Sequence, residues 1–81
     1  MRKYEVIWER IKNADHEAWT TVSVADASRI QTIINMVMRE KSQAHLARKA
    51  LDLPAFGKLE IKRDPDNKRV SFRLRNSGAN L

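Results

Sequence analysis

The sequence predicts one small α+β domain in which a mainly antiparallel sheet packs on one long helix, in the order strand, strand, helix, strand, strand. Three patterns support this fold class. Residues 69–75 alternate between polar and apolar side chains, residues 64–67 form a turn signal, and apolar residues recur every three or four positions from Ile30 onward. We assign residues 1–75 to this domain and residues 76–81 to a flexible C-terminal tail.

A β-hairpin is predicted over residues 58–75. Its turn contains Pro65, which presets the backbone dihedral, beside Asp and Asn side chains that can bond nearby backbone N–H groups. Because side chains alternate along a strand, Val70, Phe72 and Leu74 point inward, and Leu59 and Ile61 join them from the first strand. The outward face then carries one acid, Glu60, among Lys58, Lys62, Arg69, Arg73 and Arg75.

A long helix is predicted between Asp26 and Pro54. Its apolar stripe begins at Ile30 and continues through Val37 to Leu51, as expected for a helix with one buried face. Asp26 is a candidate N-cap, and Pro54 ends the pattern. The pattern fits either one long helix or two helices with a break near Ser42, and we predict one helix that can accommodate a kink.

The N-terminal segment fits two structures. Apolar residues at positions 4, 7, 8 and 11 would share one helical face, whereas the run 6–8 with the β-rich segment 19–24 fits a hairpin. We predict strands, because a strand at residues 19–25 needs a neighbour in the sheet. The resulting order is similar in outline to that of β-grasp domains, a scaffold that hosts unrelated functions.

Composition excludes several classes of protein. The 81 residues contain no cysteine, which rules out a disulfide scaffold, a thiol nucleophile and a cysteine-ligated zinc ion. A chain this short has little interior for a deep catalytic cavity, and it contains no apolar run of membrane-spanning length. We therefore expect a cytoplasmic, non-enzymatic protein that requires no cofactor and has no contact with a membrane.

Motifs for catalysis and metal binding are incomplete. Only two glycines occur, at positions 57 and 78, so the chain has no glycine-rich phosphate loop. Asp52 followed by Glu60-Ile61-Lys62 resembles the acidic-x-lysine signature of metal-dependent nucleases, which would imply phosphodiester cleavage. The match covers three adjacent residues and one distant acid, and we predict neither catalytic nor metal-binding residues.

The segment 41–51 resembles the opening helix of helix-turn-helix DNA-binding units, with Gln43, Leu46, Ala47 and Ala50 at the packing positions. That family usually has a glycine at the turn, where this chain has Leu51. The segment 54–57 also leads into a predicted strand rather than into a recognition helix. A complete helix-turn-helix unit is therefore not predicted.

The net charge of +6 lies entirely in the second half of the chain. Residues 1–38 contain five bases and five acids, whereas residues 39–81 contain eleven bases and five acids. Such a concentration of cations is typical of proteins that bind phosphate-rich or carboxylate-rich partners. We predict a binding module that contacts the phosphates of DNA or RNA. The predicted contacts are Arg48, Lys49, Lys58, Lys62, Lys68, Arg69, Arg73 and Arg75.

The main alternative is a protein-binding inhibitor or adaptor, of the kind encoded by phages and mobile elements. Its basic face would dock on an acidic protein surface. Trp19 has the opposite strand parity to Val22 and Val24, so we expect an exposed ring that either anchors such a partner or covers the sheet edge. Pairing of an exposed sheet edge with a second copy is a further option, which would give a homodimer.

Overall fold

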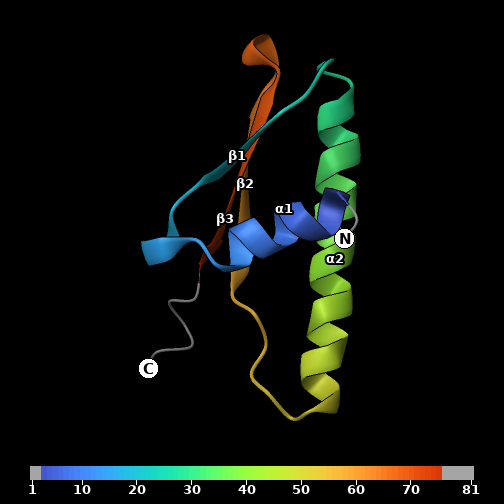
Figure 1. The fold of residues 1–81 in the computed structure, drawn as a ribbon, viewed down its shortest axis with the longest axis vertical. Helices are drawn as coiled ribbons and strands as arrows, with labels where there is room; N and C mark the ends of the chain where they lie inside the picture. Colours follow the sequence, from blue (N-terminus) through green and yellow to red (C-terminus); the bar gives the residue numbers. More distant parts are fainter. Residues whose placement is uncertain (1–2, 76–81) are drawn as a thin grey trace.

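The computed structural model describes residues 3–75 and confirms the α+β class (Figure 1). Residues 3–75 form two helices and three strands in the order α1, β1, α2, β2, β3, with one short 3₁₀ turn between α1 and β1 and another between β2 and β3. The helices are α1 (Lys3–Lys12) and α2 (Arg29–Ala50), and the strands are β1 (Thr20–Ser23), β2 (Lys58–Asp64) and β3 (Arg69–Arg75). The 3₁₀ turns are η1 (Asp15–Glu17) and η2 (Pro65–Asn67). The predicted tail, residues 76–81, lies outside the described residues.

The three strands form one antiparallel sheet in the order β1-β3-β2. Ile61 of β2 and Thr20 of β1 both lie opposite Phe72 of β3, which is therefore the central residue of the central strand. The predicted hairpin and its turn at residues 64–67 are present. Lys68 closes the turn in the left-handed conformation, with φ of 53°. The free edges of the sheet belong to β1 and β2.

The predicted strand around residues 6–8 is wrong, because this segment forms α1. The described residues therefore form three strands rather than four, and their order is not the predicted β-grasp-like one. A helix buries Ile7, Trp8 and Ile11 together and leaves Val6 outside, whereas a strand would place Ile7 on the opposite face from Trp8. Glu9 and Lys12 form an ion pair at helical spacing, with 2.8 Å between Oε1 and Nζ.

The long helix is continuous, as predicted, and begins at Arg29. Asp26 acts in the turn before it, where its Oδ1 accepts a hydrogen bond of 3.0 Å from the Ser28 N–H. The buried residues of α2 all lie in its first half and end at Val37. The second half extends past the sheet, and the chain then returns to β2 instead of entering another helix (Figure 1).

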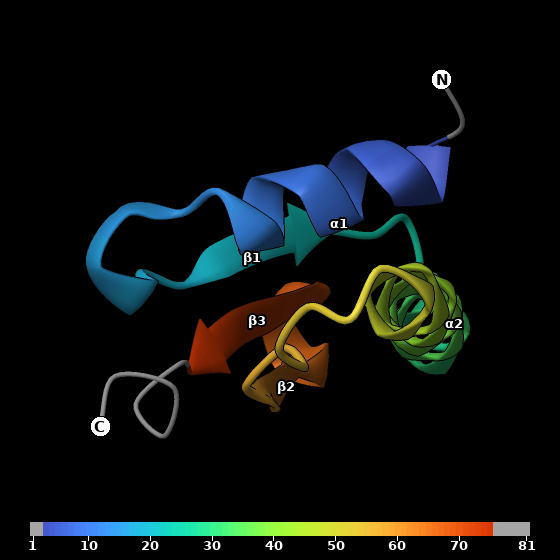
Figure 2. The ribbon, with the colours of Figure 1, turned by 90° about the horizontal axis from the view of Figure 1, so that it is seen from below.

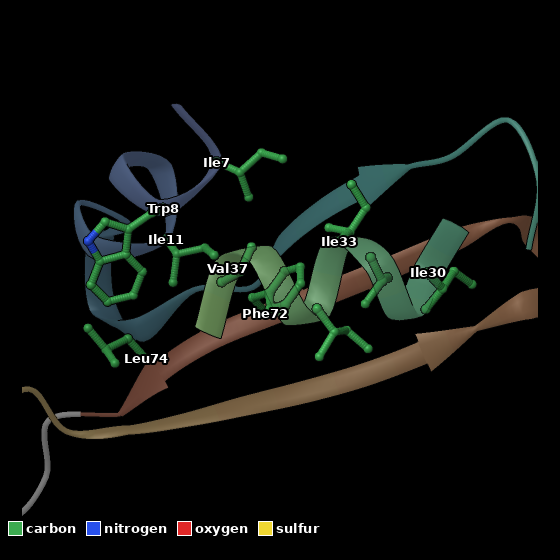
Figure 3. Packing of buried hydrophobic residues seen from close by; sticks show 10 residues of the cluster. Ile7, Trp8, Ile11, Ile30, Ile33, Val37, Phe72 and Leu74 are labelled. Carbon is green, nitrogen blue, oxygen red and sulfur yellow. The ribbon is translucent and has the colours of Figure 1, made fainter. Parts of the chain in front are cut away.

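The hydrophobic core lies on one face of the sheet. The two helices lie on the same side of the sheet (Figure 2). Val70 and Phe72 of β3 are fully buried, and side chains of α1 and α2 pack with them in one cluster (Figure 3). The other face, which we call the outer face, is covered by no helix of residues 3–75 (Figure 2). Over this described range, neither helix is both long and apolar enough to cross a membrane.

Candidate nucleic-acid interface

The outer face gathers most of the predicted contact residues. Strand register places alternate side chains of β2 and β3 opposite each other on this face, in the pairs Lys58 and Arg75, Glu60 and Arg73, Lys62 and Ser71, and Asp64 and Arg69. Thr21 and Ser23 of β1 continue it beyond β3. With five cations and two acids, the outer face has a formal charge of +3.

Arg73 and Glu60 form the central ion pair of the outer face. The Nε and Nη2 groups of Arg73 both donate to Oε1 of Glu60, the first at 2.8 Å. These hydrogen bonds hold the pKa of the Glu60 carboxyl below its ordinary value of 4.5, and the charges of Arg73, Arg75 and Lys58 act in the same direction. Glu60 therefore stays ionised and offsets one cation of the face.

A second acid is neutralised near the turn. Asp64 accepts hydrogen bonds from the Asn67 side-chain amide, and its Oδ2 lies 3.1 Å from Nη2 of Arg69. The Asn67 donor, followed by Arg69, lowers the pKa of Asp64 below its ordinary value of 3.8. Arg69 has a partner within its own chain, which sequence alternation alone did not predict.

Arg75 is the most loosely held arginine of the outer face. Its guanidinium nitrogens lie 3.9 Å from Oε1 of Glu17 and 3.7 Å from Oε2 of Glu60. At these separations the ion pairs include no direct hydrogen bond, so the Arg75 donors remain available to a ligand.

The lysines of the hairpin differ from its arginines. Within the described part of the chain, Lys58, Lys62 and Lys68 have no ion-pair partner, and all three side chains are exposed. The outer face therefore combines three arginines that contact acids with lysines that are free to bind anions.

Trp19 lies at the border of the outer face, just before β1. The guanidinium carbon of Arg73 is 4.5 Å from the centre of the Trp19 ring, and the residue is 41% exposed. The predicted exposure is therefore found, although Arg73 covers part of one ring face. Nearby, the hydroxyls of Thr21 and Ser71 are 2.8 Å apart across β1 and β3.

Arg48 and Lys49 do not belong to this face, because they lie in the last turn of α2. Arg48 stacks over the Phe56 ring at 3.9 Å and donates a 3.0 Å hydrogen bond to the carbonyl oxygen of Pro54. Phe56 in turn packs edge-to-face on Trp8, with ring centroids 5.3 Å apart. Arg48 thus attaches the loop before β2 to the helix, a structural role that sequence reasoning missed.

The nuclease-like residues do not form a cluster of acids. Glu60 is bound to Arg73, whereas Asp52 follows α2 in an exposed turn, with φ of 58°. Among residues 3–75, no three His, Cys, Asp or Glu side chains gather in a way that would hold a metal ion. No protein-family model, curated protein or solved structure matches the chain.

Proposed function

We propose that the chain is a small binding module that contacts nucleic-acid phosphates through the outer face of its sheet. One observation carries this proposal. The face is open in the described structure and has five cations, but only two acids, each already bound to an arginine.

The chemistry of the face suits a phosphate backbone. Within residues 3–75, Lys58 and Lys62 have no ion-pair partner, and no carboxylate lies at hydrogen-bond distance from the guanidinium donors of Arg75. Such contacts supply affinity that depends little on base sequence, because phosphates are the same at every nucleotide. Trp19 lies beside Arg73, and the hydroxyls of Thr21 and Ser71 lie nearby. A nucleic-acid strand bound to the cations could therefore also reach the tryptophan ring and these hydroxyls.

A salt series tests the proposal directly. Binding to duplex and single-stranded oligonucleotides of DNA and RNA is measured by fluorescence anisotropy at increasing salt. We expect the logarithm of the affinity to fall linearly with the logarithm of salt concentration, by about 0.7 per phosphate contact for single strands and about 0.9 for duplexes. Absence of binding to all four ligands at low salt would refute the proposal.

A matched pair of variants locates the contact. Arg69→Gln/Arg75→Gln removes two cations from the outer face, whereas Arg10→Gln/Arg29→Gln removes two exposed cations from the helices. We expect the first variant to bind more weakly and with a shallower salt slope, and the second to bind nearly as the wild type does. Equal losses in both variants would mean that net charge, rather than the outer face, attracts the ligand.

Trp19 favours one second candidate, a protein-binding module. An exposed tryptophan beneath an arginine combines two residue types that dominate protein interfaces. In that case a nuclease-treated lysate would still yield a partner, and Trp19→Ala would release it. Oligonucleotides alone would then bind weakly, which separates this candidate from the first.

A further inference from the structure

Strand β2 is an open sheet edge. It pairs with β3 on one side only, and its residues make no backbone hydrogen bond to any other part of the described chain. It lies at the end of the sheet farthest from α1 (Figure 2). A seven-residue strand with free N–H and C=O groups along one side is a template for pairing with another strand.

The sequence of β2 is complementary to itself when two copies run antiparallel. With Ile61 opposite Ile61 of a second copy, Lys58 lies opposite Asp64 of that copy, and Glu60 lies opposite Lys62. By two-fold symmetry each contact occurs twice, so all four charged side chains of β2 on the outer face meet an opposite charge. Cross-strand pairs of opposite charge stabilise a sheet.

Neighbouring registers lack this match. Sliding one copy by two residues in one direction brings Lys58 opposite Lys62 and Glu60 opposite Glu60. Sliding it by two residues in the other direction brings Glu60 opposite Asp64 and Lys62 opposite Lys62. Like charges placed opposite each other destabilise the pairing, so the side chains select the register centred on Ile61.

The ion pairs within one chain fit this arrangement. Glu60 and Asp64 are bound on their β3 side, by Arg73 and Arg69, whereas Lys58 and Lys62 have no ion-pair partner in residues 3–75. In the paired sheet, each acid would lie between an arginine of its own chain and a lysine of the second copy. Both lysines of β2 are therefore without an ion-pair partner in residues 3–75, and the symmetric register would neutralise both.

The inner side of β2 adds an apolar contact. A groove of about 240 Å³ separates β2 from α2, and its lining includes Met38 and Ile61. Met38 is 50% exposed, and Leu59 and Ile61 are only partly buried. In the register centred on Ile61, a second copy would bring its own Ile61 opposite Ile61 and the aliphatic part of its Arg63 opposite Leu59.

From these observations we infer that the protein forms a symmetric homodimer by antiparallel pairing of β2 with β2, which joins two three-stranded sheets into one of six strands. The interface is isologous, as in most two-fold dimers. The inference goes beyond the proposed function and does not depend on it. Pairing would engage Lys58 and Lys62 with acids of the second copy, and the arginines of the two outer faces would then lie on one surface.

Complementary charge reversals test the register. Lys62→Glu places two acids opposite each other at both symmetric contacts, and Glu60→Lys places two lysines there. We expect each variant alone to weaken dimerisation by about tenfold or more, as measured by sedimentation equilibrium. Lys68→Glu makes the same charge change in the turn outside β2, and we expect it to dimerise as the wild type does.

Mixing the two variants provides the decisive measurement. An equimolar mixture with one chain labelled with nitrogen-15 should form a heterodimer, because positions 60 and 62 are then both acidic in one chain and both basic in the other. Native mass spectrometry distinguishes this species from both homodimers. Lys58→Glu mixed with Asp64→Lys tests the other symmetric contact as a second pair. Glu60→Lys removes the partner of Arg73 and Asp64→Lys removes that of Arg69, so circular dichroism checks that every variant is folded.

Three results would overturn the inference. The first is a wild type that remains monomeric across the concentration series. The second is a set of charge reversals that leave the dimer unchanged, and the third is a set of mixtures that fail to restore it. None of these outcomes bears on nucleic-acid binding, which the Arg69→Gln/Arg75→Gln variant tests separately. Conversely, a protein that dimerises but binds no oligonucleotide would support the β2 interface and refute only the proposed function.

Discussion

The guanidinium of Arg73 lies 4.5 Å from the centre of the Trp19 ring while two of its N–H groups donate to Glu60. Trp19 immediately precedes β1, Arg73 belongs to β3 and Glu60 to β2. One side chain thus connects all three strands across the outer face. The connection depends on a planar cation that can stack and donate hydrogen bonds at the same time.

Arg73→Lys should destabilise the fold although it keeps the charge. An ammonium group has neither the flat surface that covers Trp19 nor the fork that engages Glu60. We expect a loss of about 0.5–1 kcal/mol in the free energy of unfolding from the ring contact at this partly exposed position, measured by urea denaturation. Oligonucleotide affinity should change little. An unaltered urea midpoint would show that the stacked geometry does not contribute to stability.

Acid should destabilise the protein below the ordinary pKa values of its paired carboxyls. The pKa values of Glu60 and Asp64 are lowered by their hydrogen bonds from Arg73 and Asn67, so both carboxylates bind protons less readily in the folded state than in the unfolded state. The stability that these carboxylates contribute is fully present above pH 4.5 for Glu60 and above pH 3.8 for Asp64. It is lost as the pH falls through the lowered pKa values of the folded state. Urea midpoints measured from about pH 7 down to about pH 3 should show this decline.

A control variant isolates the effect of Glu60. Glu60→Gln cannot titrate, so its stability should be lower than that of the wild type at neutral pH, and the difference should shrink in acid. A constant difference at every pH would contradict the assignment of part of the acid sensitivity to this carboxyl.

Oligonucleotide binding should strengthen when the outer face loses its two acids. Glu60→Gln/Asp64→Asn raises the formal charge of the face from +3 to +5, and we expect tighter binding and a steeper salt slope at neutral pH. Anisotropy with a thymidine oligonucleotide measures both quantities. Asp15→Asn/Asp66→Asn, which changes two acids outside the paired strand positions, is the matched control. Equal gains in both variants would argue against a localised contact.

Arg48→Lys should affect stability rather than binding. The planar contact with Phe56 would be lost and the hydrogen bond to Pro54 weakened, at a cost of about 0.5–1 kcal/mol for the stacking alone. Lys49→Ala, at the neighbouring exposed position, should be close to neutral. The two urea curves decide between a structural role for Arg48 and the phosphate contact that its sequence position indicated.

The hairpin was predictable because each of its signals is local. Alternation assigns Val70 and Phe72 to the core, and the turn residues bring β2 and β3 into antiparallel register. The ion pairs were not predictable from alternation alone. Alternation places Glu60 and Arg73 on the same face, but it does not show that they lie directly opposite each other. Trp19 was placed correctly by parity, whereas its contact with Arg73 depends on the pairing of β1 with β3.

The N-terminal segment was mispredicted because two periodicities coincide there. Residues 6–8 are all bulky and apolar, which favours a strand locally, whereas positions 4, 7, 8 and 11 share a helical face. The strand prediction also required a neighbour for β1 from the N-terminal side. That neighbour is β3, from the other end of the chain, so residues 3–12 were free to cover the sheet as a helix.

Two substitutions in α1 separate these alternatives experimentally. Ile11 is 2% exposed, and Ile11→Ala should lower the free energy of unfolding by about 2–5 kcal/mol because it leaves a cavity in the core. Val6 is 42% exposed on the helix, so Val6→Ala should change stability by less than about 0.5 kcal/mol. If residues 6–8 formed a strand, Val6 and Trp8 would share its inner face and Val6→Ala would be costly. A large loss for Val6→Ala in urea denaturation would therefore contradict the helix.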